Sequence, residues 1–213
     1  MVTEDQSALI DFLTLPSTHD GAKVERLDTH SALVFLAGDR AYKLKRAVRF
    51  DYLDFSTAGK RRDSCDAEVR LNRRMAPTIY RGVVAVTRQP GGALRLGGSG
   101  PVVDWLVEMN RFPQEALFDR LAASGDLALE LMPPLADAIV TVHAGAGRRA
   151  DHGGKAGMHW VADGNAGGFL EFGAACLERS ACDRVIADTY RELERQAALL
   201  EARRQSGFVR QCH

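Results

Sequence analysis

The amino-acid sequence predicts an α+β fold, in which an antiparallel sheet with one packed helix precedes a mostly helical region. Between residues 24 and 110, short apolar runs alternate with tight-turn signals, which is typical of antiparallel strands. After about residue 113, apolar residues recur at helical spacing and prolines stand where helices begin. We therefore expect an N-terminal helix and lead-in over residues 1–23, a strand-rich lobe with its linker over 24–112, and a partial helical lobe over 113–213.

Composition indicates an ordinary globular protein whose partners are small molecules or other proteins. The chain has 213 residues, of which 46% are hydrophobic and 26% charged, a balance that supports a folded core. Its 28 basic and 28 acidic side chains cancel, so no global field favours nucleic acid or an anionic membrane as a partner. Its four cysteines form no C-x-x-C pair, and its acidic start differs from a signal peptide. We expect reduced thiols and a cytoplasmic location.

The firmest predicted element is a hairpin whose turn is the Gly38-Asp39 pair, because Gly-Asp between two apolar runs is a two-residue turn signal. Counting outward from this turn pairs Val34 with Lys43. One face of the hairpin is then core, made of Leu33, Phe35, Tyr42 and Leu44. The other face is an apolar floor that ends in lysines. Such a floor suits a ligand with a flat apolar part and an anionic tail.

A helix is expected after this hairpin, capped by Ser56 and running to about Met75. Glu68 falls on the same side of this helix as Cys65, the side that faces the core. The basic run at residues 60–62 is interleaved with acidic side chains. We therefore expect that run to form a solvated helix face.

The rest of the chain is expected to contain a short first helix, two further strands, a long late helix and a final strand. These elements cover residues 7–15, 80–88, 102–109, 182–205 and 208–213. The stretch between Gly145 and Gly168 is rich in glycine and charge, and we expect it to be loop.

Lys43 and Glu68 are the main candidates for chemistry. A phosphate-binding lysine on the third strand of a kinase is held by a carboxylate on the following helix, and the spacing of these two residues fits. The spacing by itself favours the alternative interpretation, in which Lys43 is a solvated strand lysine and Glu68 is a surface residue of the helix. Ala41, two residues before Lys43, stands where a small residue roofs an adenine ring, and Val34 lies opposite it. Because only Lys43 has this neighbour, we expect Lys45 to point more toward solvent.

Two long stretches of the sequence resemble a known family. They read THSALVFLAGDRAYKLKRAVRFDYLDFSTAGKRRDSCDAEVRLNRRMAPTIYRGVVAVTR and DWLVEMNRFP. Together they resemble the aminoglycoside phosphotransferase-like domain of bacterial proteins, in which a P-loop ATPase domain often follows. The resemblance runs from Thr29 through Phe112 and more loosely to His213. It implies a protein-kinase-like fold, with an antiparallel-sheet N-lobe and an incomplete helical C-lobe.

The resemblance also implies roles for single residues at a nucleotide site. Lys43 matches the phosphate-orienting lysine and Glu68 its helix partner. The segment Glu108-Met109-Asn110 matches the linker whose backbone binds the adenine edge, and Ser31 matches a position near the phosphates. The implied cofactors are ATP and, with the remainder of the catalytic lobe, Mg²⁺. A small-molecule acceptor is the implied second partner.

The catalytic loop of this family begins with His-Gly-Asp, and the sequence ends at the residue that matches its first position, His213. The general base and the magnesium ligands would therefore lie beyond His213. No catalytic residue and no metal ligand is assigned within the chain, and we expect the chain by itself to be inactive.

Two functions from different classes remain open at this point. In the first, the chain is the nucleotide-holding part of an ATP-dependent small-molecule phosphotransferase. In the second, it is a non-catalytic module with a kinase-like fold that binds a nucleotide or a protein. The coding sequence after His213 distinguishes them, because only the first requires Gly-Asp and a nearby asparagine there.

Overall fold

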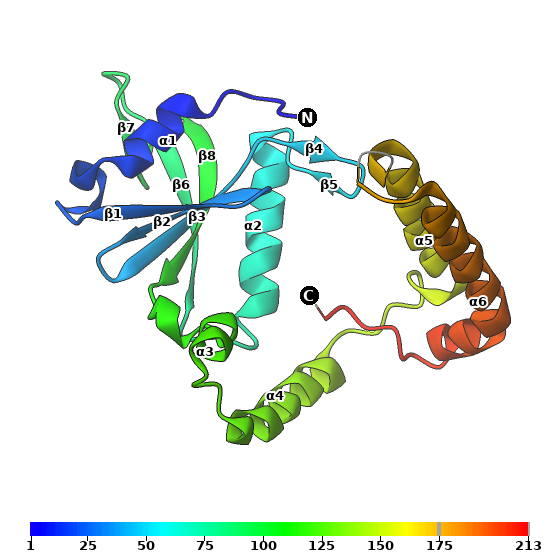
Figure 1. Cartoon of the computed structure of the whole chain (residues 1–213). Coiled ribbons are helices and arrows are strands. Elements are labelled where there is room, and N and C mark those ends of the chain that lie inside the picture. Colours follow the sequence, from blue (N-terminus) through cyan, green and yellow to red (C-terminus); the bar gives the residue numbers. More distant parts are fainter. Residues whose placement is uncertain (174–175, 213) are drawn as a thin grey trace. The chain divides into compact units, whose positions relative to one another are not determined.

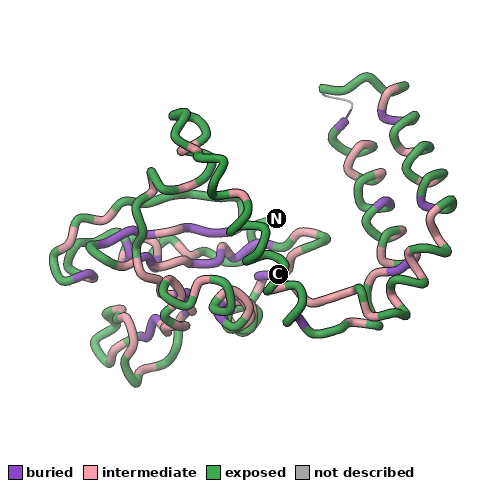
Figure 2. Tube along the Cα trace, turned by 90° about the horizontal axis from the view of Figure 1, so that it is seen from below, coloured by how far each residue is buried: buried purple, intermediate pink, exposed green. Residues whose placement is uncertain are grey.

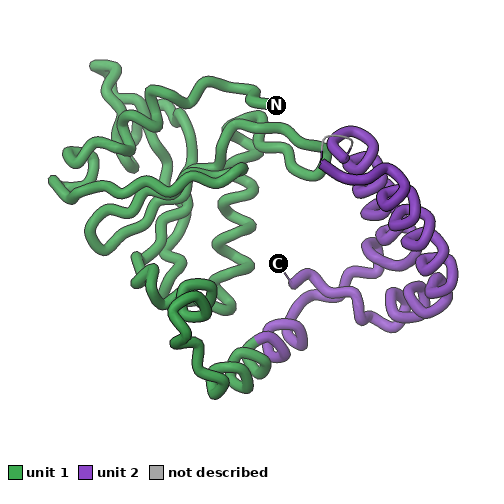
Figure 3. The backbone as a smooth tube through the Cα atoms, viewed as in Figure 1, with its two compact units in different colours: residues 1–138, 213 green, residues 139–212 purple. Residues whose placement is uncertain are grey.

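The computed structural model describes residues 1–173 and 176–212, and it shows an antiparallel sheet followed by helices (Figure 1). The predicted α+β class is confirmed. The chain divides into two compact units, residues 1–138 and residues 139–212 (Figure 3). All residues of the expected nucleotide site belong to the first unit.

The first unit is built on a six-stranded sheet in which every neighbouring pair of strands is antiparallel. Along the sheet, the order of strands is β1-β2-β3-β8-β6-β7. These strands are β1 (Val24–Asp28), β2 (Ala32–Ala37), β3 (Arg40–Lys45), β6 (Tyr80–Arg88), β7 (Leu94–Leu96) and β8 (Val102–Asn110). Two of the expected strands are thus confirmed as β6 and β8, and β8 lies between β3 and β6.

The hairpin of β2 and β3 has the predicted register. Val34 pairs with Lys43, and Leu36 pairs with Ala41. Gly38 at the turn has a φ of 56°, a left-handed conformation that glycine adopts without steric cost. A second, smaller hairpin that the sequence did not indicate follows β3 and consists of β4 (Arg49–Phe50) and β5 (Leu53–Asp54).

Helix α1 (Ser7–Thr14) packs on one face of the sheet. Its Leu9 and Leu13 are buried with strand residues that alternate inward on this face, Leu33, Phe35, Leu44, Val86 and Leu106. The expected helix and core face are confirmed. Pro16 follows the helix and opens a short 3-10 turn, Pro16–His19.

Helix α2 (Ala58–Asn72) packs on the opposite face, against β8 and β6. Its Cys65 and Val69 contact Val107, which neighbours Leu106 in β8 and therefore points to the other side of the sheet. The predicted cap was wrong. Ser56 donates its hydroxyl to the Asp54 carboxylate, and the side chain of Thr57 accepts the helix amide hydrogen bond instead.

The chain beyond β8 is helical, as expected, but one predicted loop was wrong. After the turns at Gln114–Ala116 and Leu129–Leu131, its helices are α3 (Phe118–Ser124), α4 (Met132–Gly145), α5 (Gly154–Phe172) and α6 (Arg179–Gln205). Helix α5 forms within the glycine-rich stretch because it packs along α6, where Tyr190 donates a hydrogen bond to Asp163 and Lys155 pairs with Glu194. Tertiary packing of this kind overrides weak helix propensity.

The expected final strand was wrong for the described residues 208–212. They contribute one isolated bridge, in which Arg210 pairs with Arg148, and no extended ladder. His213, which the resemblance matches to the start of a catalytic loop, lies outside the described residues. Buried positions follow the strands of the sheet, and exposed positions predominate along α5 and α6 (Figure 2). Within the described ranges, no helix is long and apolar enough to cross a membrane.

Candidate nucleotide site

The expected ion pair is present between β3 and α2. Lys43 Nζ lies 2.8 Å from Glu68 Oε1 and donates a hydrogen bond to it. The two residues meet because Lys43 points to the face of the sheet that α2 covers. Glu68 lies one helical turn beyond Cys65, on the side of α2 that contacts this face. The Lys43 side chain keeps 31% of its surface exposed, and the Glu68 side chain keeps 12%.

The prediction for Lys45 was wrong. Its side chain is only 7% exposed, and its Nζ lies 2.7 Å from Glu68 Oε2. The ammonium also lies 5.0 Å from the centre of the Phe55 ring, a cation–π contact. The neighbour Ala41 distinguished Lys43 from Lys45 in sequence, but strand residues two apart share a face. A carboxylate with two oxygens therefore accepts both lysines.

Glu68 is ionised in this environment. Burial by itself raises the pKa of its carboxyl, but the charges of Lys45 and Lys43 and their hydrogen bonds outweigh burial, so the pKa lies below its ordinary value. The cluster of one carboxylate and two ammonium groups therefore carries one excess positive charge. A pocket of about 280 Å³ adjoins it, lined by both lysines and, from α2 and β6, by Ser64, Ala67, Glu68, Leu71, Asn72 and Tyr80.

Cys65 lies beneath this cluster and does not take part in its chemistry. Its side chain is fully buried, and burial raises the pKa of the thiol to about 12. The thiol therefore stays protonated at neutral pH and is a poor nucleophile.

An apolar floor lies on the same face of the sheet as Lys43. It contains Val34 beside Lys43 and Ala41 two residues before it, and Ala41 pairs across the strands with Met109. Ala41 is 5% exposed, whereas Val34 is half-buried. Ser31 lies in the turn between β1 and β2, where its carbonyl accepts a hydrogen bond from the Arg46 amide. The structure therefore brings Val34, Ala41, Met109 and Lys43 onto one surface.

The segment Glu108-Met109-Asn110, which the resemblance matches to the linker, is the end of strand β8. Glu108 and Met109 each pair with β3 on one side and with β6 on the other. The Glu108 carboxylate lies 3.5 Å from Arg40 and 3.4 Å from Arg81, so it serves ion pairs on the sheet. Asn110 ends the strand. The irregular backbone that leaves the sheet begins at Arg111, so the strand expected over residues 102–109 is present with one further residue.

Arg61 was also predicted wrongly, as part of a solvated helix face. It is fully buried, and its Nε donates a hydrogen bond to Asp104 Oδ1 at 2.8 Å. Its Nη2 donates to Glu4 at 2.8 Å and its Nη1 to the Phe55 carbonyl at 3.0 Å. Gln6 donates to the second oxygen of Asp104 at 2.9 Å. Arg61 thus joins α2, β8 and the N-terminal segment. The only sequence signal for the buried role of Arg61 was its spacing, because a residue four before Cys65 lies on the same face of the helix.

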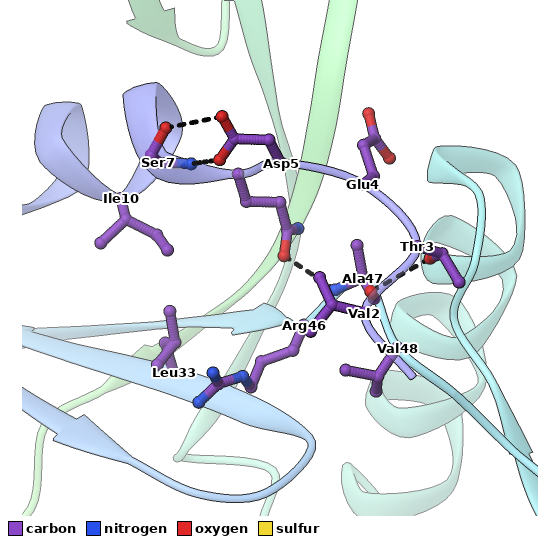
Figure 4. Close-up of a pocket in the computed structure, with 11 residues that line it drawn as sticks. Val2, Thr3, Glu4, Asp5, Ser7, Ile10, Leu33, Arg46, Ala47 and Val48 are labelled. Carbon is purple, nitrogen blue, oxygen red and sulfur yellow. Dashed lines mark hydrogen bonds between the residues drawn. The ribbon is translucent and has the colours of Figure 1, made fainter.

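A second pocket, of about 500 Å³, lies between the N-terminal segment and residues 46–48 (Figure 4). Its polar groups largely serve the fold. The Thr3 hydroxyl donates to the Ala47 carbonyl, and Asp5 accepts from the amide and hydroxyl of Ser7. This pocket is larger than the one beside Lys43 and Glu68, but its two carboxylates are already bonded, Glu4 to Arg61 and Asp5 to Ser7. We therefore place the candidate site at the lysines. Among the described residues, no group of three or more His, Cys, Asp or Glu side chains is arranged to hold a metal ion.

Comparison with known proteins gives only partial similarity. No protein-family model matches the sequence, and no solved structure matches it. The chain is similar to uncharacterised proteins of Mycobacterium tuberculosis and Mycobacterium bovis, with 45% identity over 65 residues in each case. The match covers 30% of this chain and 13% of the length of those relatives.

Proposed function

We propose that this chain is the nucleotide-holding lobe of an ATP-dependent small-molecule phosphotransferase with a protein-kinase-like fold. The observation that carries the proposal is the 2.8 Å ion pair between Lys43 and Glu68, at the edge of an apolar floor. In kinases, a lysine on the third strand and a glutamate on the following helix must be paired before the lysine can orient the phosphates of ATP. Here the lysine is on β3 and the glutamate on α2, the first helix after it.

Each part of the surface has a role in this proposal. Val34 and Ala41 contact the flat face of adenine, and the backbone at the end of β8, in the segment Glu108-Met109-Asn110, takes the adenine edge. Lys43 contacts the phosphates, and the turn at Ser31 lies over them. The excess positive charge of the cluster attracts the anionic triphosphate.

The transfer step itself is not assigned to this chain. In aminoglycoside phosphotransferases, the general base and the Mg²⁺ ligands belong to a segment that begins with a His-Gly-Asp loop, and we assign neither role to a described residue of this chain. A small hydroxylated or amino-bearing acceptor, an attached P-loop ATPase domain and a cytoplasmic location belong to the same proposal. Cys65, Cys176 and Cys182 form no disulfide, which fits a reducing compartment.

Calorimetric titration of Mg-ATP tests the proposal, with the 213-residue chain and with the complete protein that the gene encodes. We expect the complete protein to bind Mg-ATP and the chain to bind it more weakly. Lys43→Ala should reduce the affinity of the complete protein at least tenfold, about 1.4 kcal/mol, and reduce phosphoryl transfer by orders of magnitude.

Matched variants separate the phosphate contact from the adenine contact. Val34→Ala should weaken binding of ATP but leave binding of inorganic tripolyphosphate unchanged, whereas Lys43→Ala should weaken both. Lys60→Met removes a lysine on the exposed side of α2 and should change neither. A complete protein without affinity for any nucleotide would refute the proposal and favour the alternative, a module that binds another protein.

A further inference from the structure

The pocket of about 500 Å³ beside the N-terminal segment has mostly apolar walls. Ile10 of α1 and Leu33 of β2 line one side of it, and Val2 and Val48 line the other (Figure 4). Leu33 alternates along β2 with Val34, which belongs to the apolar floor, so this pocket and the candidate nucleotide site lie on opposite faces of the sheet. Its volume is within the range of pockets that hold small molecules.

Hydrogen bonds to residues 45–47 hold the N-terminal side of the pocket in place. Thr3 donates its amide to the Ala47 carbonyl at 2.8 Å. Gln6 accepts from the Ala47 amide at 2.7 Å and donates to the Lys45 carbonyl at 3.1 Å. The two sides of the pocket are therefore bonded to each other before a ligand enters, which keeps the entropic cost of binding low.

Arg46 brings a guanidinium group to this pocket. The group donates one side-chain hydrogen bond, from Nη1 to the Thr29 carbonyl at 3.3 Å, and none of the described carboxylates forms an ion pair with it. Asp28, at the end of β1, pairs with Arg26 instead, at 2.6 Å. A guanidinium has several N–H donors in a planar fork that matches a carboxylate, so Arg46 retains donors for an anion.

The two carboxylates that line the pocket limit the charge of its ligand. The backbone amide and the hydroxyl of Ser7 donate to Asp5 and hold the pKa of that carboxyl below its ordinary value, so Asp5 is ionised at neutral pH. Glu4 is paired with Arg61. These charges repel a ligand with several negative groups, whereas a single anion is attracted by Arg46, on the side of the pocket away from Asp5 (Figure 4).

We propose that this pocket is a second ligand site, for a monocarboxylate with a short apolar chain. The carboxylate binds Arg46, and the chain lies between Ile10, Leu33 and Val48. Both parts are needed, because a single partly exposed ion pair binds weakly and the apolar walls by themselves do not select an anion. The inference does not rest on the proposed function, because it concerns the opposite face of the sheet.

Sodium hexanoate is the probe for this site, and methyl resonances of the isotope-labelled complete protein report its binding. We expect the methyl groups of Ile10, Leu33 and Val48 to shift, with a dissociation constant on the order of 1 mM, which is usual for a ligand of this size. Acetate keeps the charge without the chain, and hexanol keeps the chain without the charge. Each should bind at least about tenfold more weakly than hexanoate.

A matched pair of variants tests the contact with the carboxylate. Arg46→Met should weaken binding of hexanoate about tenfold and leave binding of hexanol unchanged, because only the carboxylate contacts the guanidinium. Arg49→Met is the control, since Arg49 does not line the pocket and lies 3.8 Å from Asp54. It should change the affinity for hexanoate by less than about twofold. Thermal unfolding checks that each variant is folded.

Three results would overturn the proposal. Equal affinity for hexanoate and hexanol would show that apolar contact alone explains binding. Equal losses from Arg46→Met and Arg49→Met would show that the general charge of this region attracts the anion. Unchanged methyl resonances of Ile10, Leu33 and Val48, at hexanoate concentrations well above the expected dissociation constant, would show that the pocket holds no such ligand. None of these results bears on Mg-ATP binding, so the proposed function is tested separately.

Discussion

Helix α2 carries two ion clusters, seven residues apart on one face, and they differ in burial and in charge. The Arg61 cluster joins a fully buried guanidinium to Asp104, which is 1% exposed, and to Glu4. The Glu68 cluster joins one carboxylate to Lys43 and Lys45 and leaves the Lys43 side chain 31% exposed.

This difference is the reason why we assign the Arg61 cluster to the fold and propose the Glu68 cluster as a ligand site. Arg61 donates to two carboxylates and a backbone carbonyl, and it connects three parts of the first unit, so nothing is left for a ligand to reach. The Glu68 cluster has an excess positive charge beside a pocket and an apolar floor. We therefore choose the candidate binding site by a partly exposed cluster with a net charge, and not by the burial or the strength of an ion pair.

The largest expected effect comes from breaking the closed cluster. Arg61→Met should destabilise the protein by about 3–5 kcal/mol, because it leaves the Asp104 charge buried without its cation. Urea unfolding measures the loss. Replacing both partners, as Arg61→Met with Asp104→Leu, should recover much of it.

Arg70→Met on the exposed side of the same helix is the control and should change the unfolding free energy by less than about 0.5 kcal/mol. A similarly small loss from Arg61→Met would show that the buried cluster contributes little, and the contrast between the two clusters would disappear.

A smaller effect is expected from Glu68→Gln, of about 1–3 kcal/mol at pH 7, because a buried lysine loses its carboxylate. This loss depends on pH. The pKa of Glu68 is lowered in the folded protein, so its stabilising contribution is complete above the unfolded value of about 4.3 and is lost as the pH falls through the folded value.

Unfolding of wild type and Glu68→Gln across pH checks this sign. The stability difference should stay constant from about pH 8 to pH 6 and shrink below about pH 4.3. A difference that grows on acidification would mean that Glu68 is not ionised in the folded state.

Sequence reasoning predicted the local parts of the site and missed the long-range ones. The turn at Gly38 fixed the register of β2 and β3, and that register together with helical spacing placed Lys43 opposite Glu68. The burial of Arg61 depends on Asp104, which is 43 residues away, and on Glu4, which is 57 residues away. Neither partner is indicated by any pattern within the helix, so the basic run looked like a solvated face.

Two other failures have similar causes. Residues 154–172 have a composition typical of a loop, and their helix depends on packing along α6. The N-terminal residues pair with residues 47–49, since Thr3 donates its amide to the Ala47 carbonyl and Val2 bridges to Val48. These two segments are far apart in the sequence, so no short turn between them could have predicted the pairing.

The central claim is that nucleotide binds at the open cluster of α2 and not at the closed one. Chemical-shift mapping tests it most directly, by titrating Mg-ATP into isotope-labelled protein and following backbone and methyl resonances. We expect the shifts to concentrate at Ser31, Val34, Ala41, Lys43 and Glu68, with Arg61 and Asp104 unchanged. Shifts gathered instead around the pocket of Val2 and Val48, or no shifts at saturating Mg-ATP, would contradict the account.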